Sequence, residues 1–475
     1  MLTLDDAKEY QDRLTELRRL FHRFPDRTGH EEKTVERISA ILTKAGIDHE
    51  VVKDGGILAY IYGKGYEPEA GKEPWKDGYV EEGTPCLLTH GCTAKDRTLS
   101  WKMRTVLLRA DVDALPVPEN PCNLNQEKDC FSEVEGVSHA CGHDSHIAMM
   151  IVAAEYLAAH REEISGRIIV MFERGEEGPN NIVHIFRRMI EKNLHVDTIY
   201  AAHVYYALES GKIAVQAGPV MAGGVFYKIL IRGRGGHGSR PDLAANPIDC
   251  YVMIQNALND FRMKHVGPFH TLVFAPTIVH SGDVDNVIPG ELTFGGNVRL
   301  YDLDDGVRFT EYFMETLDHV CPLYGCEYEV IYCVGPKMPV KNDAECAKIA
   351  KKAAVSTVGE ENVVEFEPWM ACESFCVPLA IWPGVYTFIG NRNPEKGTGA
   401  LHHSPKFDVD EEIMPAGFST AVNYALSFLQ DPEIKPGHGW FDGSAADVYE
   451  ASRYSAEVVS YLRYGTPYTI PEGKR

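Results

Sequence analysis

Three short apolar runs organise the first half of the chain, and each leads within a few residues to polar side chains able to do chemistry. The runs are 106–108, 167–172 and 198–200. They alternate with helical patterns, such as the apolar residues spaced three and four apart over 7–21, a helix we expect to end before Pro25. Helices that alternate with strands, with function at the strand ends, are typical of α/β folds. The pattern therefore predicts an α/β fold whose site lies where these strands end.

The pattern changes between about residues 223 and 333. Strand-like segments at 226–231 and 292–300 enclose two helical stretches, near Pro247 and Gly306. The segment predicts an inserted α+β domain.

Length and charge exclude several classes of protein. A chain of 475 residues that is 44% hydrophobic can bury a large core in two or three domains. Its net charge of −22 argues against nucleic-acid and anionic-lipid surfaces. Asp5, Asp6 and Glu9 precede any apolar run, and the longest apolar stretch, 147–159, is short and contains Glu155. We expect a cytoplasmic protein without a membrane span, with its twelve cysteines as reduced thiols.

Cys141 and His143 are the first candidate metal ligands. At positions i and i+2 they point to one side if the segment is extended, ahead of a helix-like stretch from His146. A lone Cys-x-His is weak evidence, because buried cysteines and hydrogen-bonded core histidines are common.

Further ligand types follow along the chain. Glu176 and Glu177 come after the apolar run 167–172, and adjacent carboxylates on a loop can divide metal binding and proton transfer between them. A solvated turn is the alternative for such a pair. His203 is placed where a strand is expected to end, and the pair 402–403 lies on an expected loop. Isolated histidines of this kind are more often structural than metal-binding.

Taken in order, these residues lie in motifs that resemble the M20 metallopeptidases, in particular their amidohydrolase branch of aminoacylases, hippurate hydrolases and auxin-conjugate hydrolases. The resemblance covers nearly the whole chain and rests on the segments 18–26, 109–116, 140–144, 176–178, 202–204, 235–241, 285–289, 296–299 and 402–408. It implies a two-domain α/β architecture, in which an α+β lid or dimerisation domain is inserted into a metal-binding catalytic domain. The expected boundaries are 1–221 and 335–475 for the catalytic domain and 222–334 for the lid.

The resemblance also implies two divalent metal ions per subunit, zinc or manganese, with cobalt or nickel also compatible with the ligand types. The implied ligands are Cys141, His143, Glu177, His203 and His403, with the Cys141 sulfur bridging. His402 leaves the last ligand ambiguous by one residue, and we favour His403 because it directly precedes Ser404 and Pro405.

Carried over from the family, Glu176 is the expected general base and Asp113 orients a ligand or the water. His237, in a glycine-rich segment, is the expected lid histidine, and Asn286 and Arg299 are expected to hold polar groups of the substrate. For His237 a structural hairpin is the alternative, since no Gly-Lys-Ser/Thr follows to make a phosphate loop. Arg299 could equally form a surface ion pair.

The implied function is hydrolysis of the amide bond of an N-acyl amino acid or related conjugate by a homodimer or higher homo-oligomer. A dipeptidase or carboxypeptidase is the nearest alternative. A hydrolase with Cys141 as nucleophile and a non-catalytic metal-binding protein are the others.

The chain departs from the family pattern at four segments. Glu173 begins a Glu-Arg-Gly segment where Gln-Pro-Ala is common, and Ser374 takes the place of the aspartate in Glu-Asp-Phe. The segment 63–102 and the tail beyond about Asp431 are longer than usual. They are expected to shape selectivity or an oligomer contact.

Overall fold

The computed structural model divides the described chain into two compact units, which are considered separately. It describes residues 1–63, 104–178, 182–192, 194, 196–431, 433–434, 439–441 and 448. Unit 1 consists of the described residues within Met1–Val220, Lys341–Glu367 and Ser374–Tyr449, and unit 2 of those within Met221–Val340 and Pro368–Glu373. Apart from Gly63, the long segment expected at 63–102 lies outside the described residues, as does most of the tail beyond Asp431.

Unit 1 is built on an eight-stranded sheet with the strand order β1-β2-β4-β3-β5-β16-β6-β15. Its strands are β1 (Asp48–Val52), β2 (Gly56–Tyr62), β3 (Arg104–Asp111), β4 (Gly166–Glu173), β5 (Thr198–Glu209), β6 (Ile213–Ala214), β15 (Val363–Val364) and β16 (Gly384–Arg392). The central strands β4, β3, β5 and β16 run parallel, whereas β1, β2 and β6 run antiparallel to their neighbours β2, β4 and β16. The mixed α/β fold expected from the sequence is confirmed.

The three apolar runs of the sequence form the centre of this sheet. Every residue of β4 is buried, as is all of β3 after Arg104. β5 runs on to Glu209, so the expectation that a strand ends at His203 is wrong. Only the buried part of β5 ends there, at Val204, and the remainder stays in the sheet because β16 pairs with it.

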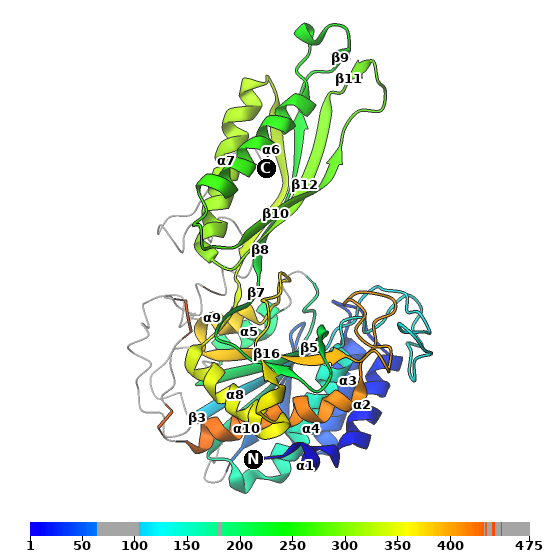
Figure 1. Ribbon diagram of the computed structural model, residues 1–475, viewed down its shortest axis with the longest axis vertical. Helices are drawn as coiled ribbons and strands as arrows, with labels where there is room; N and C mark the ends of the chain where they lie inside the picture. The colour runs from blue at the N-terminus through cyan, green and yellow to red at the C-terminus, as the bar shows by residue number, and fades with distance from the viewer. Residues whose placement is uncertain are drawn as a thin grey trace. The chain divides into compact units, whose positions relative to one another are not determined.

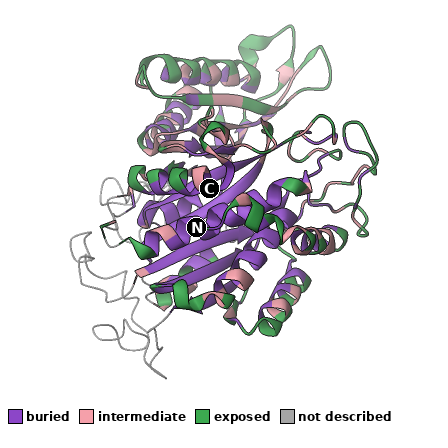
Figure 2. Cartoon of the chain, turned by 60° about the horizontal axis from the view of Figure 1, so that its bottom comes forward, coloured by how far each residue is buried: buried purple, intermediate pink, exposed green. Residues whose placement is uncertain are grey.

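The helices of unit 1 pack around the sheet. They are α1 (Leu4–Lys8), α2 (Gln11–Arg23), α3 (Glu32–Lys44), α4 (His143–Ala159), α5 (Ile182–Glu191), α8 (Ala344–Val358), α9 (Cys376–Ile381) and α10 (Met414–Gln430). α4 is buried on every side over most of its length and packs against α2, α10 and the central strands. Figure 2 shows how much of the interior of the chain is buried. The helix expected over 7–21 is two helices, because the chain turns at Glu9 and places Tyr10 against Phe418.

Unit 2 is a four-stranded antiparallel sheet with two helices on it, as expected for an α+β domain (Figure 1). The sheet order is β10-β12-β8-β13, from β8 (Gly223–Arg232), β10 (Leu272–His280), β12 (Glu291–Leu300) and β13 (Glu327–Lys337). The helices α6 (Pro247–Lys264) and α7 (Leu303–Leu323) pack on each other and on these strands. A two-stranded ribbon of β9 (Gly236–His237) and β11 (Val287–Ile288) lies beyond one end of the sheet.

A separate two-stranded sheet pairs β7 (Gly218–Met221) with β14 (Val340–Asn342). Across the part of the chain that the structure describes, no helix combines the length and the apolar character that crossing a bilayer requires.

Candidate metal centre

The candidate centre forms where parallel strands of unit 1 end side by side. Asp111 ends β3 and pairs in register with Glu173, the last residue of β4. The loop after β3 carries Asp113, and the turn after β4 carries Glu176 and Glu177. Because the carboxyl ends of parallel strands lie at one edge of a sheet, these carboxylates converge there.

A glycine turn brings the next two ligand types to this edge. Helix α4 begins at His143, so the expected extended segment and the helix start near His146 are wrong. Gly142 caps the helix with φ of 87°, a left-handed conformation that favours glycine. A Cβ at Gly142 would come within 2.4 Å of Val204 Cγ2, which shows how closely the turn packs on β5.

The five predicted metal ligands lie together. Ligand atoms of Cys141, His143 and Glu177 are all within 4.8 Å of one another. His203 Nε2 lies 3.5 Å from Cys141 Sγ, and His403 Nε2 lies 2.8 Å from Glu177 Oε1. This group of five is called the cysteine cluster below.

His402 also reaches the cysteine cluster. Its Nδ1 lies 3.7 Å from Cys141 Sγ, on the sulfur side, whereas His403 meets the carboxylate of Glu177. His403 has a φ of 64°, a left-handed conformation that is uncommon for a residue other than glycine. Such a conformation often marks a functional turn.

Asp113 joins two members of the cluster. Its Oδ1 lies 3.0 Å from His143 Nδ1, and its Oδ2 accepts a hydrogen bond of 3.0 Å from the backbone N–H of Glu177. Thr28 Oγ1 donates to the same Oδ2. When a carboxylate accepts a hydrogen bond from one ring nitrogen of a histidine, it orients the ring so that the other nitrogen can bind a metal.

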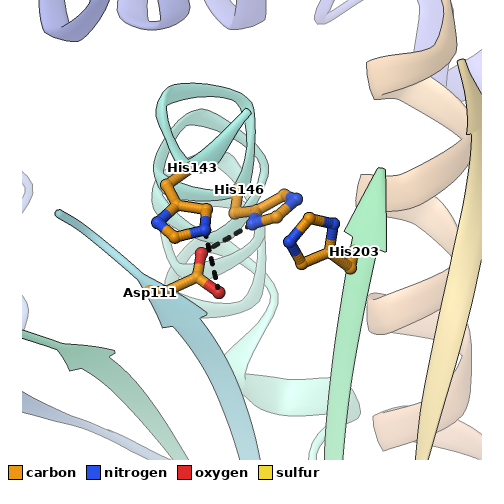
Figure 3. Close-up of side chains that lie close together, drawn as sticks. All are labelled: Asp111, His143, His146 and His203. Carbon is orange, nitrogen blue, oxygen red and sulfur yellow. Dashed lines mark hydrogen bonds and ion pairs between the residues drawn. The ribbon is translucent and has the colours of Figure 1, made fainter. Parts of the chain in front are cut away.

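Two neighbours were missed by the sequence reasoning. Asp111 and His146 lie with His143 and His203 in a second group whose ligand atoms are within 4.8 Å of one another (Figure 3). The spacing offered a clue, because His146 follows His143 by three residues on one face of a helix. Asp111 precedes Asp113 by two residues at the same strand end.

The hydrogen bonds of this second group give His146 a supporting position rather than a ligand position. His146 Nε2 accepts from the backbone N–H of Val204 at 3.0 Å, which makes Nδ1 the protonated nitrogen. Nδ1 then donates to Asp111 Oδ1 at 2.6 Å. Since both nitrogens of His146 are used, the cysteine cluster is the better candidate for metal.

The electrostatics of the centre are strongly negative. Burial lowers the pKa of His143, but Asp111 and Asp113 outweigh burial and raise the pKa to about 10. Burial, with Glu177 and Glu176 adding to it, raises the pKa of Cys141 well above its ordinary value. A thiolate at Cys141 therefore needs a nearby cation, which argues against a thiol nucleophile acting by itself.

The residues present fit divalent metal ions. His143 Nε2 is buried and has no hydrogen-bond partner among the described residues, although its Nδ1 lies against Asp113. His203 donates from Nδ1 to the carbonyl of Val204 at 2.6 Å, so Nε2, on the Cys141 side, carries the lone pair. Burial also lowers the pKa of His203 well below its ordinary value, which keeps the ring neutral. The carboxylates that hold a proton on His143 attract a metal cation in the same way, and imidazole, sulfur and carboxylate oxygen form a donor set for zinc and similar ions.

The three residues expected to bind substrate lie in unit 2, at two places. His237 pairs in register with Val287 on the β9–β11 ribbon, and the carbonyl of Asn286 accepts from Gly238 N at 2.8 Å. Arg299 lies near the other end of β12, with its guanidinium 4.9 Å from the ring centroid of Phe226. The ribbon holds His237 and Asn286 together but apart from Arg299.

Comparisons with known proteins agree with this arrangement. The family model described as Peptidase family M20/M25/M40 matches residues 107–427. Thermostable carboxypeptidase 2 of Saccharolobus solfataricus is 32% identical over 89% of this chain and 97% of its own length. IAA-amino acid hydrolase ILR1-like 4 of Arabidopsis thaliana is 28% identical over 90% of this chain and 88% of its own length.

Among solved structures, the YXEP protein of Bacillus subtilis, described as a dinuclear metal binding peptidase from the M20 family, has the same fold. It superposes with a TM-score of 0.67 at 24% sequence identity, over 89% of this chain and 99% of that chain. Its likeness extends over both units.

Proposed function

Because the chain belongs to peptidase family M20/M25/M40, we propose that it hydrolyses the amide bond of N-acyl amino acids or related conjugates, with Glu176 as general base. The observation that carries this proposal is the cysteine cluster, which has the carboxylate of Glu176 near enough to raise the pKa of Cys141. Cys141, His143 and Glu177 supply sulfur, imidazole and carboxylate atoms within 4.8 Å of one another. The chain is therefore a hydrolase of this family with a cluster of candidate metal ligands.

The cluster would hold two divalent ions through Cys141, His143, Glu177, His203 and His403, with zinc or manganese as the proposed metals. When bound, the ions would supply positive charge that lowers the pKa of a water molecule and polarises the scissile carbonyl. Asp113 holds His143 and the Glu177 backbone in place. Glu176 takes the proton from the water and delivers it to the departing amine.

Two substrate classes are compatible with this centre, namely N-acyl amino acid conjugates and peptides. The Arabidopsis relative is named for hydrolysis of IAA-amino acid conjugates, and the Saccharolobus relative is named a carboxypeptidase. The conjugate is our first choice, and a dipeptidase or carboxypeptidase acting through the same centre is the alternative. A dipeptidase requires a free α-amine, which an N-acyl amino acid lacks, so cleavage of N-acyl amino acids would exclude the dipeptidase.

The test is amine release from a panel of N-acyl amino acids and dipeptides. Chelator-stripped protein is re-supplied with manganese, zinc or cobalt, and we expect activity to return with metal and to favour N-acyl amino acids. Release that survives chelation but disappears on alkylation would replace the proposal with a Cys141 nucleophile. Silence with every metal and substrate would favour a binding protein.

We also propose a homodimer that pairs through β10. This strand lies at the edge of the unit 2 sheet and exposes Val273 and Val279. It carries no charged Lys, Arg, Asp or Glu, whereas the opposite edge β13 contains Glu327 and Glu329. Charged side chains protect sheet edges from pairing, and β10 is interrupted only by Pro276 and the bulge after it, so it is the edge that we propose pairs with a second copy.

The separation of the expected substrate residues supports a dimer. Glu291 and Arg299 are eight residues apart on β12, or about 26 Å at the usual rise of a strand, and His237 lies beyond Glu291. One amino acid conjugate is too small to contact His237 and Arg299 of the same unit. We propose that two copies contribute them to one substrate.

Mixing two inactive variants tests this dimer. Glu176→Gln and His237→Ala proteins are each expected to be inactive, and together they should regain activity after subunit exchange, because one mixed site has both residues intact. Light scattering should show twice the chain mass, and Val273→Lys with Val279→Lys should halve it. A monomeric Val273→Lys, Val279→Lys protein that keeps full activity, or a mixture that stays inactive after subunit exchange, would contradict the proposal.

A cytoplasmic location stays a prediction. The ten described cysteines carry reduced thiols, as is usual in a reducing compartment.

A further inference from the structure

The orientation of Glu176 depends on a segment far away in the sequence. Glu176 lies on the turn after β4, outside the helices and strands. The backbone N–H of Ser374 donates to Glu176 Oε1 at 3.1 Å, across 198 residues of sequence. Any movement of Ser374 therefore shifts a backbone N–H that is hydrogen-bonded to the carboxylate of Glu176, the proposed base.

Ser374 is itself anchored through its hydroxyl. Ser374 Oγ donates to Glu173 Oε1 at 2.5 Å and accepts from Arg109 Nη2 at 3.0 Å. Glu173 is fully buried at the end of β4, and Arg109 is 1% exposed on β3. The hydroxyl thus joins a loop to the two central strands of the sheet.

Arg109 extends this anchor to the metal centre. Its Nε donates to Glu173 Oε2 at 2.8 Å and its Nη1 donates to Asp111 Oδ2 at 2.7 Å. Asp111 in turn accepts from His146 and lies 3.8 Å from His143 Nε2. One guanidinium consequently fixes a carboxylate beside the cysteine cluster and the residue that holds Glu176.

We propose that Ser374, anchored by Arg109 and Glu173, is a positioning residue that aims Glu176 at the reacting water, an inference that rests on the proposed role of Glu176 as base. Misplacing a base by a fraction of an ångström lowers the rate of the chemical step more than it lowers substrate affinity. Ser374 touches neither substrate nor metal in this scheme. Its effect is therefore expected in kcat and not in KM.

The first test removes only the hydroxyl. Ser374→Ala keeps the backbone N–H but breaks the link to Glu173, and we expect kcat to fall about tenfold while KM stays within about twofold. Ser374→Thr keeps the hydroxyl and should return kcat to within about threefold of the natural protein. Ser39→Ala on α3 is the matched control, because it also removes a partly buried hydroxyl, which lies 2.7 Å from His49 Nε2, and it should leave kcat unchanged.

The second test moves the carboxylate of the anchor from residue 173 to residue 374. Ser374→Asp places a carboxylate against Glu173 and should lower kcat more than Ser374→Ala does. Adding Glu173→Gln removes the repulsion and gives the new carboxylate both a donor amide and Arg109, so the double variant should recover most of the loss. Recovery of this kind is non-additive and would arise only if residues 173 and 374 act together.

A cycle with Glu176→Asp identifies the target of Ser374. If Ser374 acts through Glu176, Ser374→Ala should lower kcat much less in the Glu176→Asp protein than in the natural one. Equal losses in both proteins, or a Ser374→Ala protein with unchanged kcat, would overturn the inference. Metal content and melting temperature are measured alongside, and a loss of kcat explained by either one would also overturn it.

The natural protein serves as the reference for both proposals. If metal never restores amine release, the proposed function fails and the inference about Ser374 fails with it. If the natural protein is active and Glu176→Gln is inactive, the function stands, and the Ser374 results alone decide this inference.

Discussion

Glu176→Gln is expected to lower kcat by about 10³, within the usual range of 10² to 10⁴ for loss of a general base. Glutamine has the shape of glutamate and can still accept the Ser374 N–H, so the side chain stays in place and only its proton affinity is lost. Metal content should not change, because Glu177 and not Glu176 belongs to the cysteine cluster. Steady-state amine release and metal analysis of the same preparation give both quantities.

The neighbouring substitution is the control. Glu177→Gln replaces a proposed ligand and should lower both the bound metal and the activity, since a neutral amide oxygen is a weaker ligand than a carboxylate. The two variants thus separate proton transfer from metal binding at adjacent positions. A Glu176→Gln protein that keeps a tenth or more of the natural kcat would assign the base to another residue. Loss of metal in Glu176→Gln would exchange the roles of the two glutamates.

The sequence predicted much of the fold and the centre because the residues concerned follow buried strands directly. The runs 106–108 and 167–172 became β3 and β4, and the carboxylates that follow them meet at one sheet edge. Cys141 and His143 are adjacent to a glycine turn whose position the sequence also shows. Local pattern thus placed these candidate residues at strand ends, whereas the resemblance to the M20 family supplied their proposed roles as metal ligands.

Features that depend on distant contacts could not be predicted in this way. His146 looked like part of an apolar helix until the Val204 N–H and the Asp111 carboxylate were seen to occupy both of its nitrogens. β5 continues past His203 only because β16 lies beside it. Likewise, Glu173 and Ser374 were each seen as separate departures from the family pattern, yet they share a hydrogen bond. Pairings of this kind are properties of the folded chain.

The second large effect is expected at Arg18, which lies beneath the helix that carries His143. Arg18 is 2% exposed and its Nε donates to Asp144 Oδ2 at 2.8 Å. Its two terminal nitrogens also contact Asp408 at 3.2 Å and Glu411 at 3.3 Å. Arg18→Met fills a similar space without charge and leaves Asp144 buried without this cation. We expect the free energy of unfolding to fall by about 3–5 kcal/mol, the usual cost of breaking a buried pair.

The effect should depend on pH in a defined direction. Burial would raise the pKa of Asp144, but Arg18 and His22 outweigh it and hold the pKa well below its ordinary value. A carboxylate with a lowered pKa contributes stability above its unfolded pKa of about 4, and this contribution is lost as the pH falls further. The difference between the natural protein and Arg18→Met should therefore be largest near neutral pH and shrink below about pH 4. Denaturant unfolding at several pH values measures it.

Arg19 provides a matched control on the same helix. It pairs with Glu411 at 2.7 Å and with Asp129 at 3.1 Å, but its side chain is 31% exposed. Water screens such a pair, so Arg19→Met should cost no more than about 1 kcal/mol. Each of the two arginines contacts more than one carboxylate, so the number of ion pairs differs little between them. A larger loss of stability in Arg18→Met than in Arg19→Met would therefore be due to burial. Equal losses for the two variants would mean that the Arg18 network stabilises the fold no more than a surface ion pair does.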